Sequence, residues 1–506
     1  MVQEYIKTFT MPGDMVLDPY GGTGVTVVEA LMLGRRAIHI DLNPLSVFIV
    51  RVLIMPIDVG SLHAEFKAIR AKFKEGCPTT PTQIQQALRK YPYPHGMRLM
   101  KNADVKTIEK LFAPIQLAQL AYLKHLIKQV KGKDIRETLL LMFSGLLNKI
   151  NLTYHASGDR TAGRGDSGMF RYYRYRLAPK PAFLDLMTYF ESRLKKVVAA
   201  KRELAAFINA DTISNAQVYK GSATSLNKIA NESVDYIYTD PPYGSKIPYL
   251  DLSVMWNAWL DFQVQEEDYQ LEAIEGGEHD KTKEDYAALV SESIEEMYRV
   301  LKFDRWMSFV FAHKDPAYWH VIILSAEKAG FEYAGAVAQR TGQSSFKKRQ
   351  NPFTVLRGQL IISFRKVRNP QALMRVNLGA DIAGIVTQTI EGIIAKENGA
   401  TLEQINDELI IKGLELGFLD VLSKEYSDLT PLLAQQFDFD MRTEKYNLRK
   451  NTKFKTRIDV ELRVRYYTYS FLRRMGHHRE DPTFDDIVLH IMPLLKMERR
   501  QRIRQS

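Results

Sequence analysis

Apolar and polar positions follow an α/β rhythm at the start of this chain. A short apolar run at 15–17 precedes a group of glycines, residues 25–33 carry apolar side chains at helical spacing, and a second apolar run covers 37–40. Buried parallel strands read as short apolar runs, whereas helices repeat their apolar face every three to four residues. The pattern predicts a strand, a glycine turn, a helix that stops at Gly34 and a second strand.

The same rhythm returns at Val218 and continues to Arg368. Apolar runs again alternate with helical patterns, and the last two runs are close enough to form an antiparallel hairpin at the edge of a sheet. The predicted segments of this part are a strand and turn at 218–223, a strand and corner at 234–244, a helix at 284–301, a strand at 305–313, a helix at 316–331, and strands at 331–340 and 358–366.

Helical patterns dominate the two remaining stretches. Residues 60–150 read as amphipathic helices, a long helix is predicted over 182–207, and the chain is again mostly helical after Arg368. The short helices over 385–436 are of the kind found in winged-helix modules. These shifts predict a first half of an α/β core at 1–59, a helical insertion at 60–215, the second half of the core at 216–368 and a helical DNA-binding or interaction module at 369–506.

Composition narrows the classes of protein. Among 506 residues there is one cysteine, Cys77, which excludes an internal disulfide framework and a zinc site built from several cysteines. We expect no metal. No apolar run is long enough to span a bilayer and no signal peptide is evident, so we expect a cytosolic protein without a membrane partner. The net charge of +11 favours a polyanionic partner, although many proteins without one are mildly basic.

The glycine turn has the residues of a nucleoside-binding site. The sequence DPYGGTG covers 18–24, and Asp41 ends the second predicted strand, where an acid can accept the hydroxyl groups of a ribose. No lysine follows the glycines, and Asp18 would repel a pyrophosphate. A cationic or zwitterionic nucleoside such as S-adenosyl-L-methionine fits this turn. The alternative is an ordinary strand–helix turn with a capping glycine.

The sequence DPPY at 240–243 follows the predicted strand at 234–239 and offers the groups needed to activate an aromatic amine. The exocyclic nitrogen of adenine is a poor nucleophile because its lone pair is delocalised into the ring. The Asp240 carboxylate and the Pro241 carbonyl could accept its two N–H bonds, and Tyr243 could stack on the base. A base in a duplex would first have to be flipped out. The alternative is a proline-rich strand end without a chemical role.

These two motifs together resemble those of the amino-methylating DNA methyltransferases, which methylate adenine N6 or cytosine N4 with S-adenosyl-L-methionine. The resemblance covers about 1–55 and 216–367. It implies a Rossmann-like S-adenosylmethionine-dependent methyltransferase sheet, interrupted here by a mainly helical insertion and followed by an α-rich C-terminal module. Carried over to this sequence, the catalytic residues are Asp240, Pro241, Pro242 and Tyr243. The cofactor-binding residues are Asp18, Tyr20, Gly21, Gly22, Gly24 and Asp41, together with Ser222, which stands where many relatives have an acid.

The DPPY form in this family is associated mostly with adenine, so the resemblance implies N6-adenine methylation of double-stranded DNA in a restriction-modification or phage-defence context. Cytosine-N4 methylation and tRNA guanine-N2 methylation remain alternatives, as do a methylase-like subunit that only binds DNA and a glutamine-methylating enzyme. No nuclease or helicase motif is present, so cleavage would need a separate restriction or defence subunit.

Two basic stretches are candidates for contact with DNA. One combines arginines with tyrosines over 154–176, and the other lies at 344–352. Arginine pairs with phosphates or guanine edges, and aromatic rings stack on exposed bases. A solvated basic loop is the alternative. The candidate nucleic-acid-binding residues are Arg160, Arg164, Arg171, Tyr172, Arg174, Lys347, Lys348 and Arg349. His313, after a predicted strand, is expected to be structural rather than a general base.

Overall fold

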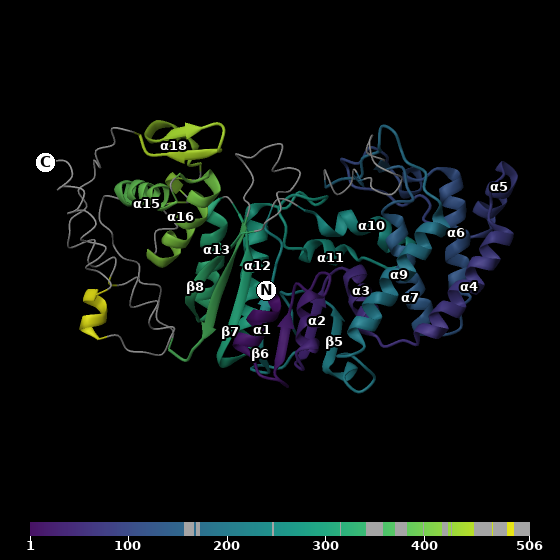
Figure 1. The fold of residues 1–506 in the computed structure, drawn as a ribbon, viewed down its shortest axis with the longest axis horizontal. Helices are drawn as coiled ribbons and strands as arrows, with labels where there is room; N and C mark the ends of the chain where they lie inside the picture. Colours follow the sequence, from purple (N-terminus) through teal and green to yellow (C-terminus); the bar gives the residue numbers. More distant parts are fainter. Residues whose placement is uncertain are drawn as a thin grey trace. The chain divides into compact units, whose positions relative to one another are not determined.

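A computed structural model gives the fold (Figure 1). The chain divides into two compact units, Met1–Lys302 and Phe303–Ser506, which we describe separately. The structure describes residues 1–155, 166–167, 173–244, 247–313, 315–340, 358–369, 382–397, 399–416, 422, 424–426, 428–449, 468 and 483–489.

The first unit opens with the predicted strand, turn, helix and strand. Helix α1 (Val2–Phe9) precedes β1 (Met15–Asp18), and α2 (Val25–Met32) leads to β2 (Arg36–Asp41) and α3 (Pro44–Ile54). The strands β5 (Ala216–Lys220) and β6 (Val234–Thr239) join them much later in the sequence. β1 pairs in parallel with both β2 and β6, and β2 pairs in parallel with β5. Strand β6, which pairs with β1, is buried along its whole length, and most of its side chains are apolar or aromatic.

The second unit contains the predicted hairpin. Strand β7 (Leu301–Phe311) leads through α13 (Pro316–Ala329) to β8 (Phe331–Arg340) and β9 (Gly358–Lys366). β9 pairs antiparallel with both β7 and β8. Asp315 caps α13 by accepting the Ala317 N–H, and Gly330 ends that helix in the left-handed region.

The seven strands have the order β5-β2-β1-β6-β7-β9-β8. Numbered within the sheet, this is 3-2-1-4-5-7-6, in which the first five positions match a doubly wound nucleotide-binding sheet. The Rossmann-like fold class is therefore confirmed. The order reverses between β1 and β6, and ligands of such sheets bind at the carboxyl ends of the strands beside that reversal.

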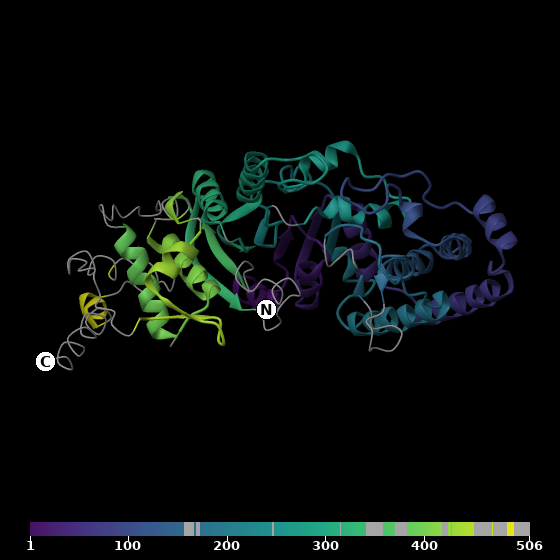
Figure 2. The ribbon, with the colours of Figure 1, turned by 90° about the horizontal axis from the view of Figure 1, so that it is seen from above.

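The insertion is helical, and its helices lie together beside α3 in both views (Figures 1 and 2). Their apolar faces enclose one core with α10 (Tyr249–Trp259), centred on the buried rings of Phe143, Phe190 and Trp259. Two short strands, β3 (Tyr154–His155) and β4 (Asp166–Ser167), pair within it. The insertion helices are α4 (Val59–Gly76), α5 (Pro81–Lys90), α6 (Pro114–Lys128), α7 (Lys133–Leu147) and α9 (Leu186–Leu204).

The first unit then continues through α11 (Glu266–Leu271) and α12 (Lys283–Val300). In the second unit, the described part after Arg368 is mostly helical, as predicted: α15 (Ile382–Lys396), α16 (Leu402–Leu416) and α18 (Thr430–Gln436) precede a small ribbon of β10 (Asp438–Asp440) and β11 (Lys445–Asn447). A winged-helix role for these elements stays a prediction. Within the described ranges, no helix is both long and apolar enough to cross a membrane.

Candidate active site

The glycine turn and the DPPY corner leave neighbouring strands at the same edge of the sheet. Leu17 of β1 lies opposite Ile237 of β6, so the residues that follow both strands emerge side by side. A hydrogen bond ties the two strand ends together, because Thr239 Oγ1 donates to Asp18 Oδ1 over 3.1 Å. The structure therefore brings residues 18–24 and 240–243, which are more than two hundred positions apart in the sequence, to the switch point.

Asp18 is buried and directs its carboxylate at protein donors. Besides Thr239, it accepts a hydrogen bond from Thr26 Oγ1 at 2.7 Å and from the Tyr20 N–H at 3.2 Å. Burial raises the pKa of Asp18 to about 7 in spite of these bonds, and the nearby Asp240 adds to the rise. Asp18, at the end of β1, is thus hydrogen-bonded to β6, to the start of α2 and to the backbone of the glycine turn.

The turn needs glycine at two positions for different reasons. A Cβ atom on Gly21 would lie 2.1 Å from His39 Nδ1, so only a hydrogen fits above the imidazole. Gly24 has a φ of 82°, and a Cβ there would lie 2.5 Å from a methyl group of Val50. Gly22 has a φ of 50°, and a Cβ there would have only ordinary contact with the Tyr20 carbonyl oxygen, at 3.9 Å. The backbone of the turn therefore packs closely against His39 of β2 and Val50 of α3. A ligand would bind on the face of the turn that is directed away from these two side chains.

Asp41 holds the turn and keeps capacity for one more bond. Its two oxygens accept the Gly22 N–H at 2.8 Å and the Asn43 N–H at 2.7 Å, and burial raises the pKa of the carboxyl group. The Ser46 hydroxyl also acts as a hydrogen-bond donor that lowers this pKa. An ionised carboxylate has about four acceptor positions, so one remains for a hydroxyl group of a ligand. This arrangement at the end of β2 fits the ribose of S-adenosyl-L-methionine.

His39 supports the turn and was missed in the sequence. The Ser46 hydroxyl donates to the Gly22 carbonyl at 2.5 Å, and His39 Nε2 lies 3.2 Å from the same hydroxyl oxygen. Because that hydroxyl has a single proton, which it gives to Gly22 and Asp41, the imidazole must be the donor to its oxygen. Burial lowers the pKa of His39 to about 4, so the ring is neutral. A histidine within an otherwise apolar strand beside a glycine turn was the available signal.

Two other predicted cofactor residues have their side chains occupied by protein. The Tyr20 hydroxyl lies 2.7 Å from Ser293 Oγ on α12, and burial raises the pKa of Tyr20 to about 12. Ser222 follows β5, and its hydroxyl lies 2.8 Å from Thr224 Oγ1 and accepts the Thr224 N–H at 3.1 Å. Ser222 thus stabilises its own turn. A contact with the cofactor stays a prediction for both residues.

The DPPY corner presents a carboxylate beside an aromatic ring. The Tyr243 hydroxyl donates a hydrogen bond to Asp240 Oδ1, while Asp240 keeps a surface exposed to solvent. Desolvation of the carboxyl group raises the pKa of Asp240, and the bond from Tyr243 opposes that rise. The Pro242 carbonyl accepts the Tyr286 hydroxyl at 2.9 Å. The Pro242 carbonyl therefore already has a hydrogen-bond donor from within the protein.

The segment after the corner adds Tyr249, which the sequence did not single out. It is the first residue of α10 and is 47% exposed. Partial burial and the nearby Asp240 raise the pKa of Tyr249 to about 12. Glu272 fixes the start of this helix because its Oε1 accepts the Leu250 N–H at 3.0 Å, and burial raises the pKa of Glu272 to about 8.

Most of the predicted nucleic-acid contacts lie outside the described residues: Arg160, Arg164, Arg171, Tyr172, Lys347, Lys348 and Arg349. Arg174 is described, and its guanidinium donates to the Asn102 carbonyl at 3.3 Å and lies 3.8 Å from Asp104 Oδ1. In the second unit, His313 is buried and its Nδ1 accepts the Asp315 N–H at 3.0 Å, as a structural residue would. The described part of the chain holds no group of acidic, histidine or cysteine side chains suited to a metal ion.

Known proteins resemble this chain in its sequence. The family model described as DNA methylase, N6_N4_Mtase, matches residues 1–49. The Type II methyltransferase M.MjaII of Methanocaldococcus jannaschii is 20% identical over 70% of this chain and 76% of its own length. M.MvaI of Kocuria varians is 24% identical over 49% of this chain, and M.BsoBI of Geobacillus stearothermophilus is 25% identical over 51%. The chain spans about half the length of these last two relatives.

Solved structures resemble it only distantly. A TehB-like SAM-dependent methyltransferase from Corynebacterium glutamicum is 9% identical, with a TM-score of 0.25, over 72% of this chain and 86% of the other. A SAM-dependent methyltransferase from Methanosarcina mazei is 10% identical, with a TM-score of 0.26, over 72% of this chain and 97% of the other. Scores this low carry no argument, so the fold class rests on the strand order.

The sequence matches agree with the two motifs. The chain is similar to amino-methylating DNA methyltransferases, whose family model matches its first 49 residues. These matches support S-adenosyl-L-methionine as the cofactor. That the glycine turn and Asp41 bind it stays a prediction.

Proposed function

We propose that this protein transfers a methyl group to N6 of an adenine flipped out of double-stranded DNA. The observation that carries the proposal is the position of Asp240, at the end of β6 and beside the turn that ends β1. A carboxylate there can accept an N–H of the target amine next to the bound cofactor. The roles of Asp240, Pro241, Pro242 and Tyr243 as catalytic residues are part of this proposal.

The corner acts by positioning and polarisation. The Asp240 carboxylate accepts one N–H of the amine, and the Pro241 carbonyl accepts the other, because the Pro242 carbonyl already has Tyr286 as its donor. Two acceptors draw the nitrogen out of conjugation with the ring and aim its lone pair. The bound cofactor supplies a methyl group on a sulfonium. In this proposal the base stacks on the rings of Tyr243 and Tyr249.

The ionisation of Asp240 and the candidate DNA contacts both bear on how a flipped base would be held. Asp240 must be ionised to accept an N–H bond, and the hydrogen bond from Tyr243 favours the ionised form. The candidate DNA contacts of the two basic stretches would hold the duplex in place around the flipped nucleotide. A role in a restriction-modification or phage-defence system, with cleavage by a separate subunit, belongs to the same proposal.

One experiment tests the target. The protein is incubated with isotopically labelled cofactor and either unmethylated genomic DNA or total RNA, the nucleic acid is digested to nucleosides, and the labelled nucleoside is identified by mass. We expect N6-methyl-2′-deoxyadenosine from DNA and no labelled nucleoside from RNA, and no label in either with Asp240→Ala. Labelled N4-methyl-2′-deoxycytidine would move the target to the other amine that this corner can hold. Label in RNA alone would contradict DNA as the substrate.

A further inference from the structure

Helix α12 contacts the DPPY corner through one buried hydroxyl group. Tyr286 is 1% exposed, and its hydroxyl donates to the Pro242 carbonyl at 2.9 Å. The start of the helix is itself fixed, because Thr282 and Asp285 form a reciprocal cap. The donor therefore has little freedom to move. It sets the orientation of the peptide plane between Pro242 and Tyr243, one residue away from the ring that should meet the base.

The same helix holds the glycine turn two turns further along. Ser293 is fully buried, and its single hydroxyl proton is donated to the Leu289 carbonyl at 2.7 Å. The Tyr20 hydroxyl, 2.7 Å from Ser293 Oγ, must therefore be the donor in that pair. Residues seven positions apart lie on the same face of a helix, so Tyr286 and Ser293 look toward the same side.

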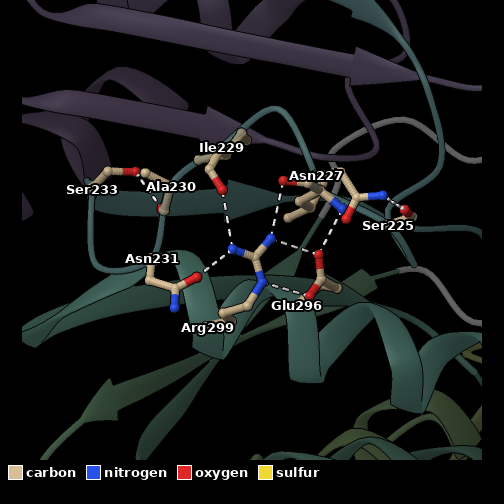
Figure 3. Close-up of polar contacts among 9 residues, drawn as sticks. Ser225, Asn227, Ile229, Ala230, Asn231, Ser233, Glu296 and Arg299 are labelled. Carbon is tan, nitrogen blue, oxygen red and sulfur yellow. Dashed lines mark hydrogen bonds and ion pairs between the residues drawn. The ribbon is translucent and has the colours of Figure 1, made fainter.

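The far end of α12 is tied to the loop that leads into β6 (Figure 3). Arg299 donates to the carbonyls of Leu226 and Ile229, each at 3.0 Å. Glu296 pairs with Arg299 and accepts the Leu226 N–H at 2.7 Å. From Tyr286 to Arg299 the helix rises by about 20 Å, which is about the length of the six-residue strand β6. The helix is therefore long enough to contact both the loop before β6 and the corner after it.

We propose that α12 is a strut that fixes the catalytic corner and the cofactor turn at a set separation, with Tyr286 as the positioning residue of the corner and Ser293 as that of the turn. The inference rests on the proposed function. Methyl transfer needs the amine in line with the methyl group, so the separation between corner and turn sets the rate. The Tyr286 bond also keeps the Pro242 carbonyl from competing for the amine.

The two ends of the strut should have separable effects on kinetics. We expect Tyr286→Phe to lower the single-turnover rate of methyl transfer by about 10-fold and to leave the Kd for S-adenosyl-L-methionine unchanged, because it releases the corner only. We expect Ser293→Ala to raise the Kd for the cofactor several-fold and also to lower the single-turnover rate at saturating cofactor, because releasing the turn changes the same separation. The matched control is Tyr298→Phe, which lies about 18 Å from Tyr286 along the same helix.

The measurements are single-turnover kinetics with active sites counted, and calorimetric cofactor binding. A purely structural role for α12 predicts lower thermal stability and fewer active sites, with wild-type rate and Kd in the molecules that remain folded; that result would overturn the proposal. The proposal would also be overturned if Tyr286→Phe and Ser293→Ala changed the single-turnover rate and the cofactor Kd to the same extent. Ser293→Ala removes a single oxygen atom, so it tests the strut even if Tyr286→Phe does not fold. Activity of Asp240→Ala, measured in parallel, reports separately on the proposed function.

Discussion

The cofactor turn and the catalytic corner follow neighbouring strands, yet their polar groups are used differently. In the turn, Asp18 and Asp41 each have three protein hydrogen-bond donors, so the acids are largely part of the scaffold. In the corner, the Asp240 carboxylate accepts a hydrogen bond from Tyr243 and keeps a surface exposed to solvent. The difference indicates that the turn is built before a ligand arrives, whereas the corner reserves its acceptors for the substrate.

Substitution of Asp240 should have the largest effect and should separate the corner from the turn most clearly. We expect Asp240→Ala to lower single-turnover methyl transfer on the order of 10³-fold, because the amine loses an ionised acceptor in a preorganised site. The Kd for the cofactor should stay within about 2-fold, because Asp240 is proposed to bind the target amine and not the cofactor. Asp240→Asn, which keeps the shape and one acceptor oxygen, serves as the partner variant. Near-normal transfer by the alanine variant, with the fold intact, would remove Asp240 from catalysis.

Gly21 tests whether the turn is prebuilt by packing. A methyl group at Gly21→Ala would meet the His39 ring, so we expect a loss of about 1–3 kcal/mol of unfolding free energy and weak cofactor binding. Adding His39→Ala makes room for the methyl group and should restore much of the lost stability. Thermal unfolding and calorimetry give both quantities. If the stability losses of Gly21→Ala and His39→Ala are additive in the double variant, the His39 ring is not what excludes a methyl group at position 21.

Asp41 tests the reserve capacity of the turn. We expect Asp41→Ala to weaken cofactor binding by about 10- to 100-fold, which is the range for losing hydrogen bonds to a charged group. The matched control is Asp58→Ala, which removes another acid that accepts backbone N–H groups, at the exposed start of α4. That change should reduce stability and leave cofactor affinity alone. An unchanged calorimetric affinity for the Asp41 variant would exclude it from the ribose site.

Tyr243 gives the smallest and most specific effect. Its hydrogen bond lowers the pKa of Asp240, so Tyr243→Phe should raise that pKa further while keeping a ring for stacking. Methyl transfer needs the ionised carboxylate and is lost as the pH falls through this pKa. The acid limb of the single-turnover pH profile should therefore move to higher pH in Tyr243→Phe and stay in place in Tyr249→Phe, the control. A limb that does not move would separate the Tyr243 hydroxyl from the ionisation of Asp240.

Local patterns determined the frame of this protein. The apolar runs predicted the strands of the sheet and its antiparallel hairpin because a buried parallel strand needs consecutive apolar residues, and a left-handed turn such as that at Gly24 favours glycine. The two motifs also indicated which strand ends carry the chemistry. The sequence could say this much because each signal is contained within a dozen neighbouring residues.

The supports of the site were decided only by the tertiary structure. Tyr286 reaches Pro242 from 44 positions away, and Ser293 reaches Tyr20 from 273 positions away. The occupied carboxylate of Asp18 likewise depends on Thr239, 221 positions along the chain. A buried polar group must find a partner, but any of many distant residues could provide it, and packing alone selects which one does. The sequence by itself therefore specified the reactive groups, whereas the folded chain specified what holds them in register.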